Sequence, residues 1–126
     1  ARPFDGMTVL LGDLNAGPGA SDENYAQVLD AGYVDAFAAA NRDSASAGLL
    51  TWDPRQPLIA GGPRRHTLPR RIDHVFLPVA EAARIAVVGA RIVFTENAVP
   101  VGGGDRVPVS DHYGVQVRLR LPDATN

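Results

Sequence analysis

Residues 7–15 have the sequence Met-Thr-Val-Leu-Leu-Gly-Asp-Leu-Asn, an apolar run that ends at a glycine and leads into two polar side chains. A short, continuous apolar run predicts a strand over residues 7–12 that is buried on both faces. Residues 13–20 contain two glycines and one proline, which predicts a loop at the end of that strand. The loop begins with Asp13 and Asn15, and side chains two residues apart in an extended segment point the same way.

Two helices are predicted to follow this loop. Ser21 is a favourable N-terminal cap, and the two acidic residues after it suit the positive end of a helix dipole. We therefore expect a helix over residues 22–31 that ends at Gly32. A second, shorter helix is expected over residues 34–40, with Phe37 on its buried face.

The second half of the chain contains the patterns of three further strands. Residues 72–77 are mainly apolar, residues 84–95 are rich in β-branched side chains with a glycine at a predicted bulge, and residues 114–121 alternate apolar with polar side chains. Residues 41–71, which precede these strands, are rich in glycine and proline and are predicted to be irregular. Together the elements predict an α+β fold with a mainly antiparallel sheet and helices on one face.

Composition limits the classes of function. A chain of 126 residues is long enough for one domain. The absence of cysteine excludes disulfides, thiolate nucleophiles and cysteine-ligated metals. The net charge of −2 is not that of a protein that binds nucleic acid by bulk positive charge. The sequence contains no apolar run of about 18 residues, so we expect no transmembrane segment.

Polar clusters at the ends of predicted strands are candidates for chemistry. In the first cluster, Asp13 and Asn15 can orient a water molecule or an anionic oxygen, although both residue types also favour plain turns. In the second cluster, Asp73 lies within a predicted strand, where a carboxylate is unfavourable unless it is paired. Its partner is either a nearby arginine, Arg70 or Arg71, or a histidine from another segment.

A third cluster, Ser110-Asp111-His112-Tyr113-Gly114, leads into the last predicted strand. Histidine titrates near neutral pH and suits proton transfer, and Asp111 beside it can contribute to a site for a hard cation such as Mg²⁺. The alternative is a solvated turn. His74 points away from Asp73 by the alternation of a strand, so we expect His74 to be a structural residue.

Four short motifs, taken in order, resemble a known family. Gly-Asp-Leu-Asn (12–15), Thr-Trp (51–52), Arg-Ile-Asp-His (71–74) and Ser-Asp-His-Tyr-Gly-Val (110–115) resemble the C-terminal half of the endonuclease/exonuclease/phosphatase superfamily, over residues 8–121. Its members include pancreatic deoxyribonuclease, abasic-site endonucleases, neutral sphingomyelinases and inositol-polyphosphate phosphatases.

The resemblance implies a fold. It implies half of a four-layer α/β/β/α sandwich, with residues 1–126 forming the C-terminal half of the catalytic domain. The N-terminal half of that domain, which supplies a metal-binding glutamate in the family, would then be absent from this chain.

The resemblance also implies roles for individual residues. Asp13 would orient or activate the attacking water, and Asn15 would hold a phosphate oxygen. His112 would contact the scissile phosphate, and Asp73 would orient His112. The metal would be Mg²⁺, with Mn²⁺ as an alternative. The implied catalytic residues are Asp13, Asn15, Asp73 and His112; the implied metal ligands are Asp111 and Asp13; the implied substrate contacts are Asn15, Trp52 and Arg71.

The implied function is metal-dependent hydrolysis of a phosphodiester by an activated water. With half of the domain absent, we expect the chain alone to bind Mg²⁺ weakly and to turn over little or nothing. Two substrate classes stay open, nucleic acid and a sphingomyelin-like phospholipid. The basic run over residues 64–71 would contact a nucleic-acid backbone or simply be solvated. A function of another class is a non-catalytic half-domain that binds a partner or a second copy of itself.

Removal of half of a sandwich would leave one apolar sheet face uncovered. We expect this face to be covered by the N-terminal half as a separate polypeptide or by a second copy in a homodimer. It would be drawn from Val9, Leu11, Val75, Leu77, Val115, Val117 and Leu119.

Overall fold

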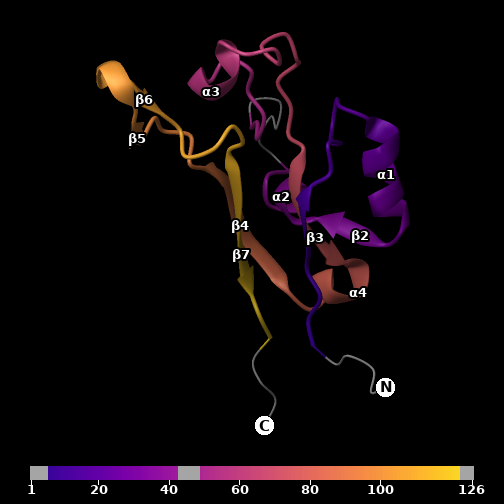
Figure 1. Cartoon of the computed structure of the whole chain (residues 1–126). Helices are drawn as coiled ribbons and strands as arrows, with labels where there is room; N and C mark the ends of the chain where they lie inside the picture. The colour runs from indigo at the N-terminus through magenta and orange to yellow at the C-terminus, as the bar shows by residue number, and fades with distance from the viewer. Residues whose placement is uncertain (1–5, 43–48, 123–126) are drawn as a thin grey trace, which may run out of the picture.

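The predicted α+β class is confirmed by the computed structural model, which describes residues 6–42 and 49–122 and combines antiparallel sheets with a few short helices (Figure 1). The strands are β1 (Leu10–Asp13), β2 (Tyr33–Asp35), β3 (Asp73–Pro78), β4 (Ala86–Val93), β5 (Val99–Pro100), β6 (Arg106–Val107) and β7 (Gly114–Arg120). The helices are α1 (Asp22–Asp30), α2 (Ala36–Ala40), α3 (Pro57–Ala60) and α4 (Val79–Ala82), with a 3₁₀ turn at Gly102–Gly104. In the described part of the chain, no helix has the length and hydropathy that a membrane span needs.

The three-stranded antiparallel sheet has β3 at its centre, in the order β1-β3-β2. β1 pairs with one edge of β3, so that Asp13 lies opposite Asp73. β2 pairs with the other edge, so that Val34 lies opposite Leu77. The pairing of β1 with β3 therefore brings two carboxylates that are far apart in the sequence to the same end of the sheet.

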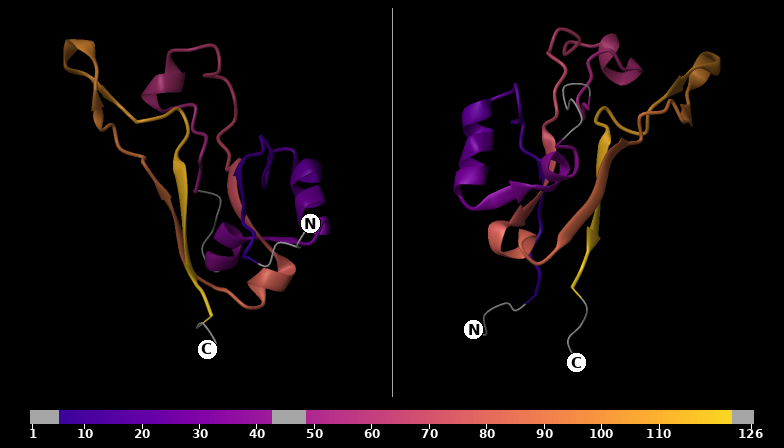
Figure 2. Two further views of the ribbon diagram at one scale, coloured as in Figure 1. Left: turned by 60° about the horizontal axis from the view of Figure 1, so that its bottom comes forward. Right: turned by 180° about the vertical axis from the view of Figure 1, so that it is seen from behind.

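Alternation along β3 separates two environments. His74 and Phe76 point to one face, where their rings contact the ring of Tyr25 from α1. Asp73 and Leu77 belong to the other face. There α2 packs against β3, and β7 runs past it (Figure 2). Segments from distant parts of the chain can therefore reach Asp73 on this second face.

A two-stranded antiparallel ribbon, β4 with β7, lies beside the first sheet, and β5 with β6 extends from its far end (Figure 1). The predicted bulge is confirmed, because the register of β4 shifts between Val87 and Gly89. The predicted alternation of β7 is confirmed up to Leu119, since its apolar residues are half-buried and the polar residues between them are exposed. Leu121 lies beyond the strand and is exposed.

The first strand is shorter and more exposed than its sequence indicates. Pairing with β3 begins at Leu10, and Leu11 is 68% exposed. The prediction of burial on both faces is therefore wrong for the described residues, because no element among them packs over Leu11. Within the apolar face predicted to be uncovered, Leu77 is in fact buried and Leu11 is open.

The second predicted helix begins later than its sequence pattern indicates. Val34 belongs to β2, which pairs with β3, and α2 starts only at Ala36. Asp35 ends the strand and caps the helix, since its Oδ1 accepts the backbone N–H groups of Phe37 at 2.9 Å and Ala38 at 3.1 Å. Strand pairing outweighs helical periodicity here.

The first predicted helix is confirmed, but its cap is not the predicted one. Ser21 has a φ of 52° and makes no capping hydrogen bond with its side chain. Oδ1 of Asp22 instead accepts the backbone N–H of Gly19 at 2.7 Å and closes the preceding loop. Gly32 has a φ of 90° and follows the end of the helix, as predicted.

Residues 49–71 are irregular apart from α3, and they share a small core with Ile72. Trp52, Ile59 and Ile72 pack together there, and Trp52 pairs with Arg70 in an isolated antiparallel bridge. The other part of the predicted irregular stretch, residues 43–48, lies outside the described residues.

Candidate active site

Two side chains from separate segments form a hydrogen-bonded pair at the end of the sheet. Nδ1 of His112, just before β7, lies 2.8 Å from Oδ2 of Asp73, the first residue of β3. An ionised carboxylate only accepts hydrogen bonds, so Nδ1 carries the hydrogen and the lone pair of the neutral ring is on Nε2. The side chains of His112 and Asp73 are 24% and 22% exposed, so solvent reaches the pair.

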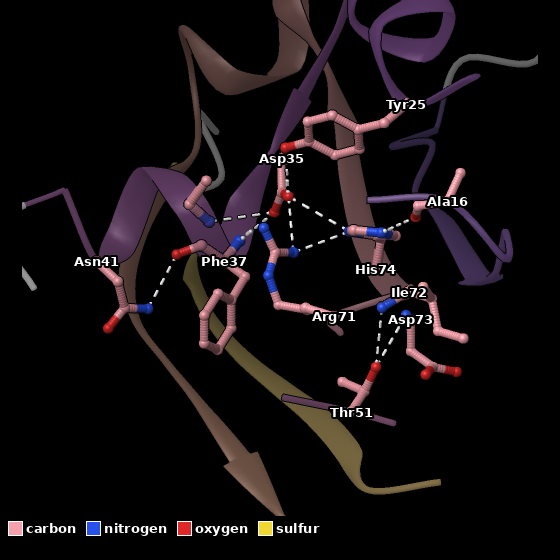
Figure 3. A network of polar contacts seen from close by, with 11 residues as sticks. Ala16, Tyr25, Asp35, Phe37, Asn41, Thr51, Arg71, Ile72, Asp73 and His74 are labelled. Carbon is pink, nitrogen blue, oxygen red and sulfur yellow. Dashed lines mark hydrogen bonds and ion pairs between the residues drawn. The ribbon is translucent and has the colours of Figure 1, made fainter. Parts of the chain in front are cut away.

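A buried threonine ties together the segments that carry this pair. Oγ1 of Thr51 accepts the backbone N–H groups of Ile72 at 3.0 Å and Asp73 at 3.2 Å (Figure 3). The carbonyl oxygen of Thr51 accepts the backbone N–H of Tyr113 at 2.7 Å. The relative positions of Asp73 and His112 therefore depend on one residue that neither strand contains, through its side chain on one side and its backbone carbonyl on the other.

β1 adds a second carboxylate to the pair. One ligand atom each from Asp13, Asp73 and His112 lie within 4.8 Å of one another. Oδ1 of Asp13 also accepts the backbone N–H of Asn15 at 2.7 Å, and Asn15 has a φ of 50°. The turn is therefore present, and it leaves Asp13 close to Asp73; the orientation of a water or an anionic oxygen by Asp13 stays a prediction.

Trp52 packs behind His112. The two rings meet edge to face with centroids 5.0 Å apart, and the indole Nε1–H donates to Oγ1 of Thr67 at 2.8 Å. The exposed guanidinium of Arg64 lies 5.9 Å from the centroid of the Trp52 ring. Trp52 is buried, and its contact with the His112 ring supports the orientation of that ring. A contact of Trp52 with the substrate stays a prediction.

Two residues predicted for the site lie apart from the Asp13–Asp73–His112 group. Asp111 is outside this group, and its backbone carbonyl accepts the Nε2–H of Gln56 at 2.9 Å. Its role as a metal ligand stays a prediction. Arg71 is buried, and its Nη1 donates to Oδ2 of Asp35 at 2.8 Å. This corrects the expectation that Arg71 contacts the substrate, because its guanidinium is used in the interior.

Arg71 belongs to a buried polar network on the α1 face of β3 (Figure 3). Oδ2 of Asp35 accepts the hydroxyl of Tyr25 at 2.8 Å as well as Nη1 of Arg71. The same Nη1 lies 2.8 Å from Nδ1 of His74, and Nε2 of His74 lies 2.7 Å from the carbonyl oxygen of Ala16. His74 is therefore a structural residue, as the sequence predicts.

The electrostatics of the network follow from these contacts. Burial alone would raise the pKa of Asp35, but contact with His74, the charge of Arg71 and the hydrogen bond from Tyr25 outweigh burial and hold this pKa well below its usual range. Burial and the hydrogen bond to Asp35 raise the pKa of Tyr25 to about 12. The interior therefore holds an ionised carboxylate paired with arginine, next to a neutral tyrosine.

Sequence reasoning missed three residues that support the site, Asp35, Tyr25 and Thr51. An aspartate directly before an apolar segment is a helix-capping signal, and Asp35 was detectable on that ground. The contributions of Tyr25 and Thr51 depend on which strands become neighbours, and no local pattern shows this.

The donor set fits a hard divalent cation. Asp13 and Asp73 offer carboxylate oxygens on neighbouring strands, and such oxygens are the ligands that Mg²⁺ and Mn²⁺ prefer. Nδ1 of His112 is already bonded to Asp73. We therefore take the two carboxylates as the ligands and His112 as their neighbour. A donor set of this kind does not select one of these metals.

No family model, curated protein or solved structure matches this chain. The resemblance to the endonuclease/exonuclease/phosphatase superfamily therefore rests on the four sequence motifs alone. The Arg-Ile-Asp-His and Ser-Asp-His motifs, which are distant in the sequence, are joined by the bond between Asp73 and His112.

Proposed function

We propose that this chain is the C-terminal half of a metal-dependent phosphoesterase domain of the endonuclease/exonuclease/phosphatase superfamily, and that the site cleaves phosphodiesters with an activated water. The observation that carries the proposal is the 2.8 Å hydrogen bond between Asp73 and His112. A histidine oriented by a carboxylate is suited to proton transfer and to contact with developing charge. Asp13 beside this pair supplies a carboxylate for the water or the metal.

Each side chain then has a distinct part in the reaction. Asp13 accepts a proton from the attacking water, whose oxygen bonds to phosphorus as the bond to the leaving oxygen breaks. The leaving oxygen takes its proton from solvent. Asp73 holds the ring so that Nε2 of His112, once it has taken a proton from solvent, donates a hydrogen bond to a phosphoryl oxygen, and the amide of Asn15 donates to another. Asp13 and Asp73 would hold a divalent cation, which would neutralise charge on the phosphoryl oxygens.

Arg64 favours a nucleic-acid strand over a choline phospholipid as the substrate. Its guanidinium lies over Trp52, which packs against His112, and the described residues place no carboxylate within ion-pair distance of it. A neighbouring phosphate of a nucleic acid would be attracted to this charge, whereas the quaternary ammonium of a phosphocholine headgroup would be repelled. A sphingomyelin-like phospholipid is the alternative substrate.

Hydrolysis of bis(4-nitrophenyl) phosphate tests the proposed reaction. We expect the chain to release nitrophenolate slowly in Mg²⁺ and to stop when the metal is chelated. His112→Ala should lower kcat by about 10²-fold or more, as loss of a transition-state contact does. His66→Ala is the matched control, because His66 is exposed and outside the Asp13–Asp73–His112 group. A rate that is independent of Mg²⁺, or equal in the two variants, contradicts the proposal.

We also propose that the two sheets form half of a four-layer sandwich that a second polypeptide completes. Exposed apolar side chains on and next to the strands support this: Leu11 and Phe94 are 68% and 65% exposed. If the chain only binds a partner or itself, association occurs without hydrolysis, and this is the alternative function. Sedimentation velocity should show a dimer or a complex with the completing half. A soluble, monodisperse monomer at high concentration contradicts this part of the proposal.

A further inference from the structure

The loop that follows β1 packs closely against the backbone just before β3, where Gly17 lies next to Arg71. A Cβ atom on Gly17 would lie 1.9 Å from the carbonyl oxygen of Arg71 and 3.2 Å from Nε2 of His74. The first distance is far below any van der Waals contact and involves backbone, which cannot move aside as a flexible side chain can. Only glycine therefore allows the loop to approach β3 this closely.

A hydrogen bond fixes the residue before Gly17. Nε2 of His74 lies 2.7 Å from the carbonyl oxygen of Ala16, and both residues are buried (Figure 3). A carbonyl oxygen only accepts, so Nε2 carries the hydrogen. Nδ1 of His74 lies 2.8 Å from Nη1 of Arg71 and 3.4 Å from Oδ2 of Asp35, so the opposite side of the ring is also held.

The loop also closes on itself and onto β3. The backbone groups of Gly17 and Ala20 exchange two hydrogen bonds, of 2.6 Å and 2.8 Å. The N–H of Leu14 donates to the carbonyl oxygen of Ile72 at 3.0 Å. Asp13 and Asn15 lie on either side of Leu14, so they are held between the end of the β1–β3 ladder and the contact at residues 16 and 17.

We propose that Gly17 and His74 form a clamp that positions Asp13 and Asn15 against the Asp73–His112 pair. His74 is a positioning residue, since it acts through the carbonyl of Ala16 and points away from Asp73. Because β3 carries Asp73 on one face and His74 on the other, one strand sets the positions of both halves of the site. The catalytic consequence rests on the proposed function; the placement of the loop does not.

Four variants test the clamp. Gly17→Ala introduces the backbone clash, and His74→Leu removes the donor to Ala16. His74→Gln keeps an amide N–H in place of Nε2–H and is the conservative rescue. Gly61→Ala is the matched control, because its Cβ would meet nothing within 4 Å. The two readouts are the hydrogen exchange rate of the Leu14 amide by NMR and the hydrolysis of bis(4-nitrophenyl) phosphate in Mg²⁺.

We expect Gly17→Ala and His74→Leu to accelerate hydrogen exchange at the Leu14 amide. Both variants should also lower kcat by about tenfold or more and leave KM within about twofold of wild type, because misplaced catalytic groups slow the reaction more than they weaken substrate binding. His74→Gln should recover most of both losses, and Gly61→Ala should change neither. If Gly17→Ala does not fold, the two His74 variants decide the result. Wild-type exchange at Leu14 in His74→Leu overturns the clamp. Hydrolysis by the wild type that is independent of Mg²⁺ instead overturns the proposed function, while the exchange data still decide the clamp.

Discussion

Replacement of Asp35 by alanine should destabilise the chain more than any surface change. Oδ1 of Asp35 accepts two backbone N–H groups of α2, and Oδ2 accepts the Tyr25 hydroxyl and Nη1 of Arg71. Asp35→Ala leaves the buried guanidinium of Arg71 without its counter-charge, which costs about 3–5 kcal/mol, and it removes a helix cap that contributes about 1 kcal/mol. These contributions overlap, so we expect a loss of about 4 kcal/mol in the free energy of unfolding.

Urea unfolding monitored by tryptophan fluorescence measures this loss, because Trp52 is the only tryptophan and is buried. A domain has only about 5–15 kcal/mol of stability, so Asp35→Ala can unfold the chain outright. Asp35→Asn is the milder variant, since its amide oxygen can still cap α2, and it should give a smaller loss. Asp53→Ala is the control, because its partner Arg55 is fully exposed. If Asp35→Ala is as stable as Asp53→Ala, the buried network does not hold this fold together.

Three further predictions concern separate parts of the molecule. Thr51→Val should lower the free energy of unfolding by about 2 kcal/mol, because two backbone N–H groups lose their acceptor, whereas Thr51→Ser should be near wild type in the same urea titration. Tyr25 should ionise only near pH 12 in an absorbance titration of the three tyrosines. Since the folded pKa of Tyr25 is raised above the unfolded value of about 10, the contribution of Tyr25 to stability is complete below pH 10 and is lost as pH rises through 12. Tyr25→Phe should remove this pH dependence of stability. Ionisation of all three tyrosines near pH 10 would contradict the prediction. Arg64→Ala should raise KM for a single-stranded oligonucleotide and reduce its salt dependence without a change in kcat; unchanged KM would remove the argument for nucleic acid.

Features with a local signal were predictable from the sequence. The alternation of β7, the bulge at Gly89 and the helix end at Gly32 each depend on a few neighbouring residues. That Asp73 has a partner was also predictable, because a carboxylate inside a strand needs one, but the residues alone left an arginine and a histidine open, and only the resemblance indicated His112.

Features that depend on long-range pairing were not predictable in the same way. Val34 has helical periodicity with its neighbours, but its place beside Leu77 in the sheet decides that it is a strand residue. The charge of Arg71 suits a contact with the substrate, but Arg71 pairs with Asp35, which lies on β2. The local sequence around Arg71 does not show this pairing. The sequence motifs indicated Asp111 and Asp13 as metal ligands. The register of β1 and β3 places Asp13 opposite Asp73, so Asp73 is a further candidate ligand that the motifs did not indicate.

The exposure of Leu11 also depends on long-range contacts that local sequence does not show. Its apolar neighbours predict a strand buried on both faces, and local sequence carries no information on whether another element covers each face. Burial is a property of the assembled chain and its partners, so this prediction depended on contacts that the pattern does not contain.

Paramagnetic broadening by Mn²⁺ tests the central claim most directly, because it detects weak binding of a cation next to a particular ring. The three histidines give separate ring signals, and only His112 belongs to the Asp13–Asp73–His112 group. We predict that substoichiometric Mn²⁺ broadens the His112 signals before those of exposed His66, that excess Mg²⁺ reverses the effect, and that Asp13→Asn or Asp73→Asn removes it. Equal broadening of His66 and His112, or selective broadening that survives both substitutions, would contradict a metal-dependent site at the end of β1 and β3.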